Sequence, residues 1–189
     1  GINVNFLDKD GQNVLFNAIL QGAKNLPLIE LLIKKGINLN IVDNYHKNLI
    51  DEILYVFDLQ KNPPKELDGK YKIVTEEKEY LPLGFLFLEH GLEIDKIDES
   101  GKTILQKAVE NKNFTNAEFL LNCGADVNIC DEFEKNIVHK EILKGYSNYK
   151  MIDFLVSHGA NIDARDLDEK SIVDDIVEII AIVKGFKKP

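Results

Sequence analysis

The sequence is poor in residues that hold metals or carry nucleophilic chemistry. Its 189 residues include no tryptophan, one methionine, two cysteines and four histidines. Cys123 and Cys130 form neither a C-x-x-C pair nor, with any histidine, a metal motif. We therefore expect both thiols to be unpaired in a reducing compartment, and we expect no metal or other cofactor.

Basic charge is also scarce. Lysine and arginine number 23 against 32 acidic residues, which gives a net charge of -9 and a pI near 5.0. Nucleic acids and anionic membranes both require a basic surface, so neither is expected as a partner. The longest apolar run, near 176–183, is interrupted by Glu178 and is too short to span a membrane.

What the sequence does have is an internal repeat. A phrase of the form G-x-x-[VLIA]-[ND]-x-x-D begins at Gly1, Gly36, Gly91, Gly124 and Gly159. Its closing aspartates stand at 8, 43, 98, 131 and 166, so the steps are 35, 55, 33 and 35 residues. A fixed period of this size predicts a solenoid of stacked units.

Each repeat carries the same local signals. In the first, Asp8 to Gly11 is typical of a turn, and Asn13 is placed to cap a short helix from Val14. Pro27 suits the start of a second helix, and Gly36 suits its left-handed end. Later repeats have the same order, with Asn, Thr or Ser at every cap position.

This unit resembles the ankyrin repeat, a β-turn followed by two antiparallel helices. The resemblance rests on the segments 120–128 (LLNCGADVN) and 155–163 (LVSHGANID), and it covers essentially the whole chain. The proline of the family's T-P-L-H phrase is absent throughout, and only His139 keeps the histidine. The implied fold is an all-α ankyrin-repeat solenoid of stacked helix-turn-helix units with hairpin tips.

We expect a single domain over 1–189, with about four full repeats and a C-terminal half repeat. The expected units are 1–35, 36–90 with an insertion at 59–80, 91–123, 124–158 and a capping unit at 159–189. Asp174, Asp175 and Glu178 are expected to give the last helix, from Ile172 to about Val183, a polar capping side. Because the sequence begins inside the repeat phrase, upstream repeats or a targeting segment stay open as alternatives.

We expect no catalysis, because the sequence has no Ser-His-Asp or Cys-His grouping and no phosphate-binding loop. The five repeated aspartates do not suit calcium, since successive repeats stand about 10 Å apart whereas calcium ligands lie within about 2.5 Å of the ion. His139 matches the histidine that braces the hairpin in ankyrin repeats. His90 and His158 each precede a helix-ending glycine, too far apart to share a metal.

The resemblance implies that partners bind in the concave groove formed by hairpin tips and first-helix faces. Tyr45 and Phe133 are the leading candidates, because aromatic side chains dominate binding hot spots; each could instead fold over its own hairpin. The other candidates are Tyr55, Lys47, Asn44, Glu99, Lys102, Glu132, Lys135 and Tyr71 of the insertion. The same match adds Lys9, Asp10, Gln12, Ser100, Glu110 and Lys144. We expect folding to leave these side chains free.

Three functions are compatible with these features. The first is a monomeric protein-protein interaction module, and the second is a small acidic inhibitor or immunity-type protein that masks a basic toxin or enzyme. The third is a regulatory segment of a larger enzyme or effector. The compartment expected is the cytoplasm, or a host cytosol if the chain is a delivered effector.

Overall fold

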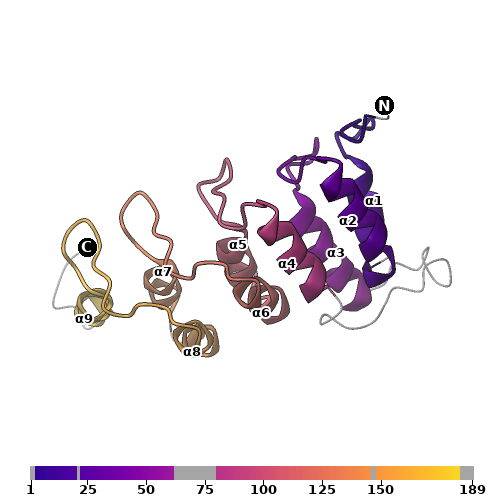
Figure 1. Cartoon of the computed structure of the whole chain (residues 1–189). Helices are drawn as coiled ribbons and strands as arrows, with labels where there is room; N and C mark the ends of the chain where they lie inside the picture. The colour runs from indigo at the N-terminus through magenta and orange to yellow at the C-terminus, as the bar shows by residue number, and fades with distance from the viewer. Residues whose placement is uncertain (1–2, 21, 62–79, 146–147, 184–189) are drawn as a thin grey trace. The chain divides into compact units, whose positions relative to one another are not determined.

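The computed structural model describes residues 3–20, 22–61, 80–145 and 148–183. The chain divides into two compact units, which we call the N-terminal unit (Gly1–Ile94) and the C-terminal unit (Asp95–Pro189). Each unit consists of helix pairs connected by extended hairpins (Figure 1). The division into a single domain of about four full repeats and a C-terminal half repeat stays a prediction.

The N-terminal unit begins with α1 (Val14–Ile19), a 3₁₀ turn (Gly22–Asn25) and α2 (Leu26–Lys34). After a hairpin follow α3 (Leu49–Lys61) and α4 (Leu81–Glu89). Helix α1 packs against both α2 and α3. The core of this unit is aliphatic and aromatic, and its fully buried side chains include Leu15, Phe16, Ile29, Ile53, Leu83 and Phe87.

The C-terminal unit repeats this arrangement. It contains α5 (Ile104–Glu110), α6 (Phe114–Asn122), α7 (Ile137–Leu143), α8 (Tyr149–Ser157) and α9 (Ile172–Val183). Helix α5 packs on α6, and α7 packs on both α8 and α9. The hairpins before α5, α7 and α9 project from one side of this unit (Figure 1).

The helix boundaries follow the predicted signals. The side chain of Asn13 accepts the backbone N–H of Leu15, and Thr103 and Gln106 form a reciprocal capping box. Pro27 lies in the first turn of α2, and Gly36 ends that helix with φ +80°. Because a left-handed φ is costly for residues with a Cβ, glycine is favoured there.

The predicted fold class is confirmed. The described residues form helices and no named strand, with only an isolated β-bridge between Arg165 and Ser171. The first helix of the second repeat, α3, has 13 residues, whereas α1 has six. It leads into the insertion, most of which, including Tyr71, lies outside the described residues.

One residue of the expected polar cap on the last repeat, Asp175, differs from the prediction. Asp175 is buried and lies 3.5 Å from the Nζ of Lys135, and Glu178 pairs with Lys170 at 2.8 Å. Asp174 accepts hydrogen bonds from the backbone N–H and Oγ of Ser171. Asp175 is therefore not part of a polar outer side, whereas Asp174 is exposed and Glu178 is partly exposed.

Candidate protein-binding surface

The repeated aspartates form the hairpins. In every repeat, one Oδ1 accepts the backbone N–H groups two and four residues ahead, as Asp43 does from Tyr45 and Lys47. At Asp43, Asp98, Asp131 and Asp166, partial burial alone would raise the carboxyl pKa, but hydrogen bonds from backbone and side-chain donors lower it. These four aspartates are therefore ionised turn acceptors, and the role of the repeated aspartate in the hairpins is structural.

The remaining chemical candidates are similarly engaged or inert. No group of three or more His, Cys, Asp or Glu residues in the described ranges could hold a metal ion. Cys123 and Cys130 are both free cysteines, Cys123 buried and Cys130 exposed. Burial raises the pKa of the Cys123 thiol to about 11, so at neutral pH it remains a thiol with little nucleophilicity.

His139 is fully buried at the start of α7. Its backbone N–H and its ring Nδ1 both contact the Oδ1 of Asn136, at 3.2 and 2.9 Å. Burial lowers the pKa of this imidazole, although the nearby carboxylates of Asp175 and Asp166 partly oppose the shift. The environment is that of a structural histidine at the helix cap.

The hairpin of the second repeat presents Tyr45 on a supported backbone. Tyr45 is 65% exposed, and its hydroxyl donates a long hydrogen bond of 3.4 Å to Asp10 in the preceding hairpin. The Asn44 amide donates to the Lys9 carbonyl at 3.0 Å, and the Nζ of Lys47 lies 5.1 Å from the ring centroid of Tyr55. The structure thus brings four predicted residues of the N-terminal unit, Tyr45, Asn44, Lys47 and Tyr55, onto one hairpin and the helix that follows it.

The hairpin of the fourth repeat presents Phe133 in the same way. Phe133 is 57% exposed, its N–H donates to Asp131, and its carbonyl accepts the N–H of Leu167 from the next hairpin at 3.1 Å. Glu132 is exposed beside it, and Glu99 is exposed in the third-repeat hairpin. Both aromatic side chains therefore lie at tips whose backbone is held by hydrogen bonds to neighbouring hairpins.

The expectation that folding leaves the candidate side chains free is wrong for several of them. Lys102 pairs with Glu110 at 2.8 Å, and Lys135 lies 3.3 Å from Asp166 and 3.5 Å from Asp175. Lys144 pairs with Glu141, and Gln12 donates to Asp43 at 2.7 Å. The sequence contains a signal for the first pair, because Lys102 and Glu110 are eight residues apart, as are the paired Lys170 and Glu178. Lys102 and Lys135 stabilise the hairpins, and their role in binding stays a prediction.

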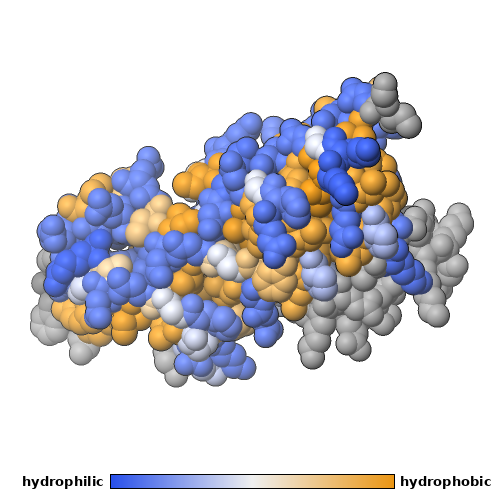
Figure 2. Space-filling view, viewed as in Figure 1, coloured by the Kyte–Doolittle hydropathy of each residue, from blue (hydrophilic) through white to orange (hydrophobic). Residues whose placement is uncertain are grey.

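Sequence reasoning missed a second group of exposed apolar side chains. Leu7, Val42 and Ile97 each directly precede a repeated aspartate, and each is about half exposed. Their common position in the repeat is the signal that could have found them. Together with the aromatic side chains, they add apolar surface to hairpins that are otherwise largely hydrophilic (Figure 2).

Comparison with known proteins identifies the repeat. A family model described as ankyrin repeats, in three copies, matches residues 77–166. The chain belongs to the ankyrin-repeat family. Ankyrin repeats are protein-interaction modules and are typically non-catalytic scaffolds. None of the helices in the described residues has the length and apolarity needed to cross a membrane.

The relatives are much longer proteins. The chain is 29% identical over 158 residues to the phosphocholine transferase AnkX of Legionella pneumophila, covering 79% of this chain and 15% of that protein. It is 36% identical over 75 residues to human inversin, covering 40% and 7% respectively. A solved complex of the Bdellovibrio bacteriovorus endopeptidase Bd0816 with the immunity protein Bd3460 includes a chain that is 21% identical, with a TM-score of 0.48. That match covers 94% of this chain and 79% of the other, and it says nothing about function.

Proposed function

We propose that this ankyrin-repeat chain binds a partner protein through its hairpins, with Tyr45 and Phe133 as the main anchors. The observation that carries this proposal is the exposure of both side chains, 65% and 57%, at hairpin tips. Neither ring is buried by its own fold. Large, rigid aromatic side chains at such positions are typical binding hot spots, worth about 2 kcal/mol or more when truncated.

The support beneath these side chains favours binding. Tyr45 and Phe133 each donate a backbone N–H to the aspartate of their own turn, at 2.8 and 2.9 Å. A side chain on a fixed backbone loses less conformational entropy when it binds than one on a mobile loop. Because the chain carries a net charge of -9, a partner with a basic contact surface would associate faster.

The test is a comparison of captured proteins. Wild-type chain and the Tyr45→Ala/Phe133→Glu variant are incubated with source-cell lysate, and bound proteins are identified by mass spectrometry. The matched control is Tyr149→Ala, which removes an aromatic side chain that is 52% exposed on α8. A protein retained by wild type and control but lost by the double variant supports the proposal, and a protein retained equally by all three contradicts it.

One alternative is supported by a specific alignment. The chain aligns with 15% of the length of a phosphocholine transferase, which favours a regulatory segment of a larger enzyme or effector. An acidic inhibitor that masks a basic protein is supported only by the net charge. A catalytic domain in the same reading frame would favour the first alternative, and a toxin gene beside this one would favour the second. A cytoplasmic monomer belongs to the leading proposal, whereas delivery into a host cytosol belongs to the effector alternative.

A further inference from the structure

In two repeats of the C-terminal unit, a lysine of the first helix pairs with the repeated aspartate. The lysine stands four residues after the helix cap in both. The Nζ of Lys107 lies 3.0 Å from the Oδ2 of Asp98, and the Nζ of Lys140 lies 3.1 Å from the Oδ2 of Asp131. The turn itself uses the other oxygen, Oδ1. We call the position between this Oδ2 and the side chain four residues after the cap the Oδ2 slot of a repeat.

The last repeat brings an ammonium group to its Oδ2 slot from elsewhere. The residue four positions after its cap is an acid, Asp175, so the slot holds two carboxylates, those of Asp166 and Asp175. Both are buried. Lys135 of the preceding repeat reaches them, and its Nζ lies 3.3 Å from one Oδ2 and 3.5 Å from the other. This cation offsets the cost of keeping two carboxylates out of water.

The second repeat has the two acids of the last repeat but not its lysine. Four residues after the cap stands Glu52, and the repeated aspartate is Asp43; they are 8% and 5% exposed. The position of Lys135 is taken here by Gln12, whose neutral amide donates to the Oδ2 of Asp43 at 2.7 Å. Within the described ranges, the Glu52 carboxylate has charged neighbours but no hydrogen bond or ion pair. It is a buried acid whose counterparts in the C-terminal unit all contribute to an ion pair.

The electrostatics at Glu52 favour an additional cation. Burial raises the pKa of Glu52, and the charges of Asp43 and Asp51 raise it further, although Lys47 partly opposes the shift. The Nζ of Lys47 lies 5.1 Å from the ring centroid of Tyr55 and makes no ion pair with Glu52. A further positive charge beside Glu52 would therefore stabilise its ionised form.

We propose that the Oδ2 slot of the second repeat, formed by Glu52 and Asp43, binds a lysine or arginine side chain of a partner protein. This inference rests on the proposed function, because it assigns the chemistry of a partner bound at the same hairpin. Tyr45 and Tyr55, two and three residues after these acids, are 65% and 41% exposed and offer aromatic surface to the apolar stem of such a side chain. A metal ion fits less well, since the described residues contain no group of three His, Cys, Asp or Glu that could hold one.

Short random peptides displayed on phage provide the probe. They are selected on the full chain, and the recovered peptides are synthesised with a fluorescent label. Binding is measured by fluorescence anisotropy for wild type, Glu52→Gln and Glu52→Lys. The first variant removes the charge with little change of shape, and the second gives the slot its own ammonium, as Lys107 does in the third repeat. The matched control is Glu30→Gln, which alters an exposed glutamate on α2 of the same unit. Circular dichroism checks that each variant folds.

We expect the recovered peptides to contain a lysine or arginine whose replacement by glutamine weakens binding to wild type by about tenfold. The same replacement should leave binding to Glu52→Gln unchanged, because the charge it contacts is already gone. Glu52→Lys should bind the unaltered peptides about tenfold more weakly than wild type, and Glu30→Gln should match wild type.

The proposal is overturned if no recovered peptide depends on a basic residue, or if wild type and Glu52→Gln bind equally. A loss on Glu52→Gln that no basic residue of the peptide explains would also overturn it. Peptides that bind Glu52→Gln normally but are lost on Tyr45→Ala/Phe133→Glu would support the hairpin surface while excluding the slot. The two proposals can therefore fail separately.

Discussion

The two compact units make equivalent links between successive hairpins with different chemistry. In the N-terminal unit, the Nε2 of Gln12 donates to the Oδ2 of Asp43 at 2.7 Å. In the C-terminal unit, the residue at the same position in its repeat is Lys135, whose Nζ lies 3.3 Å from the Oδ2 of Asp166. Lys135 also lies 3.5 Å from Asp175. One link therefore joins an amide to a carboxylate, and the other joins an ammonium to two carboxylates.

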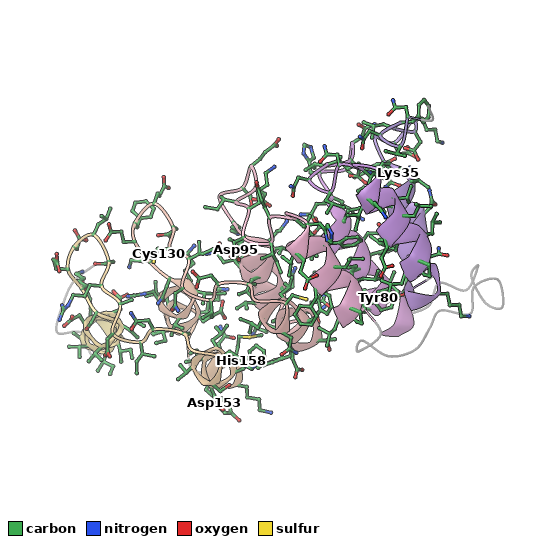
Figure 3. All side chains as sticks on the ribbon, viewed as in Figure 1. Lys35, Tyr80, Asp95, Cys130, Asp153 and His158 are labelled. Atoms are coloured by element: carbon green, nitrogen blue, oxygen red, sulfur yellow. The ribbon has the colours of Figure 1, made fainter. Side chains whose placement is uncertain are left out.

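A second pair of links shows the same contrast. Asn40 donates to the Gly91 carbonyl at 2.7 Å and accepts the Glu93 N–H at 3.0 Å. The C-terminal unit has two equivalent positions. Asp95 accepts the Asp126 N–H at 3.0 Å (residue labelled in Figure 3), whereas Asn128 makes both bonds, to the Gly159 carbonyl at 3.1 Å and from the Asn161 N–H at 2.7 Å. A carboxylate has no N–H to donate, so the second bond of the asparagine bridge cannot form at Asp95. At the Lys135 and Asp95 positions, the links of the C-terminal unit therefore depend more on charge, and hence on pH, than the matching links of the N-terminal unit.

The substitution Lys135→Ala removes the ammonium from the charged link of the C-terminal unit, and it should have the largest effect on stability. The change leaves the buried carboxylates of Asp166 and Asp175 without their cation, which costs more than losing a surface ion pair. We expect the melting temperature at pH 7 to fall by on the order of 5 °C. The buried thiol of Cys123 reports which unit opens, because both cysteines lie in the C-terminal unit and Cys123 should react only on unfolding.

The pH dependence identifies the cause of that loss. Hydrogen bonds and the Lys135 charge lower the pKa of Asp166, so their stabilisation is present above the ordinary aspartate pKa and is lost as pH falls through the lowered value. The difference between wild type and Lys135→Ala should therefore shrink below about pH 4. Gln12→Ala is the matched control in the N-terminal unit, and its effect should be smaller. An equal loss at pH 3 and pH 7 would show that Lys135 acts through packing.

Asn40→Asp would give the N-terminal unit the incomplete bridge that Asp95 makes in the C-terminal unit. The variant keeps the acceptor for the Glu93 N–H but loses the donor to the Gly91 carbonyl. We expect the free energy of unfolding to fall by about 1–2 kcal/mol, measured by urea denaturation. Asn38→Asp is the control, because the side-chain bond of Asn38 uses its Oδ1 as an acceptor for the Asn40 N–H. If both variants lose the same stability, the cost comes from added charge.

The sequence was sufficient for the helices, because caps, helix-breaking residues and the repeat period act locally. It also placed Tyr45 and Phe133 correctly at exposed hairpin tips, since no helix-packing position accounts for either residue. It could not show that Lys135 reaches Asp166 and Asp175, which are 31 and 40 residues away. Nor could it show which side of α9 the acidic residues occupy. The Lys135 contacts and the orientation of these acidic residues both depend on the rotation between successive repeats, which cannot be read from the amino-acid sequence.

Asp95→Asn would repair the incomplete bridge. The new amide could donate the missing bond, for an expected gain of about 1 kcal/mol. Burial raises the pKa of Asp95 although the Asp126 N–H partly opposes it, so its ionised form costs stability as pH rises through the ordinary value of 3.8 and the raised folded value. The advantage of asparagine should be complete at neutral pH, decrease as pH falls through the raised folded value, and be largely lost below 3.8. Denaturant titrations at pH 3 and pH 7 measure this, and a gain that is larger at pH 3 would contradict the assignment.

The smallest expected effect concerns the turn beside Phe133. Gly11 occupies this turn position in the first repeat with φ +77°, whereas Glu134 takes φ +57° in the fourth. A left-handed φ costs a residue with a Cβ about 1–2 kcal/mol, and a change to glycine would remove this cost. Glycine also has more conformational freedom in the unfolded chain, which offsets about 0.5–1 kcal/mol of the gain. Glu134→Gly should therefore stabilise the C-terminal unit by only about 0.5 kcal/mol. The reverse change, Gly11→Ala, should destabilise clearly, because its Cβ would lie 2.8 Å from the Oδ1 of Asn44. Since Asn44 supports the Tyr45 hairpin, Gly11→Ala should also weaken partner capture, whereas Glu134→Gly should leave it unchanged.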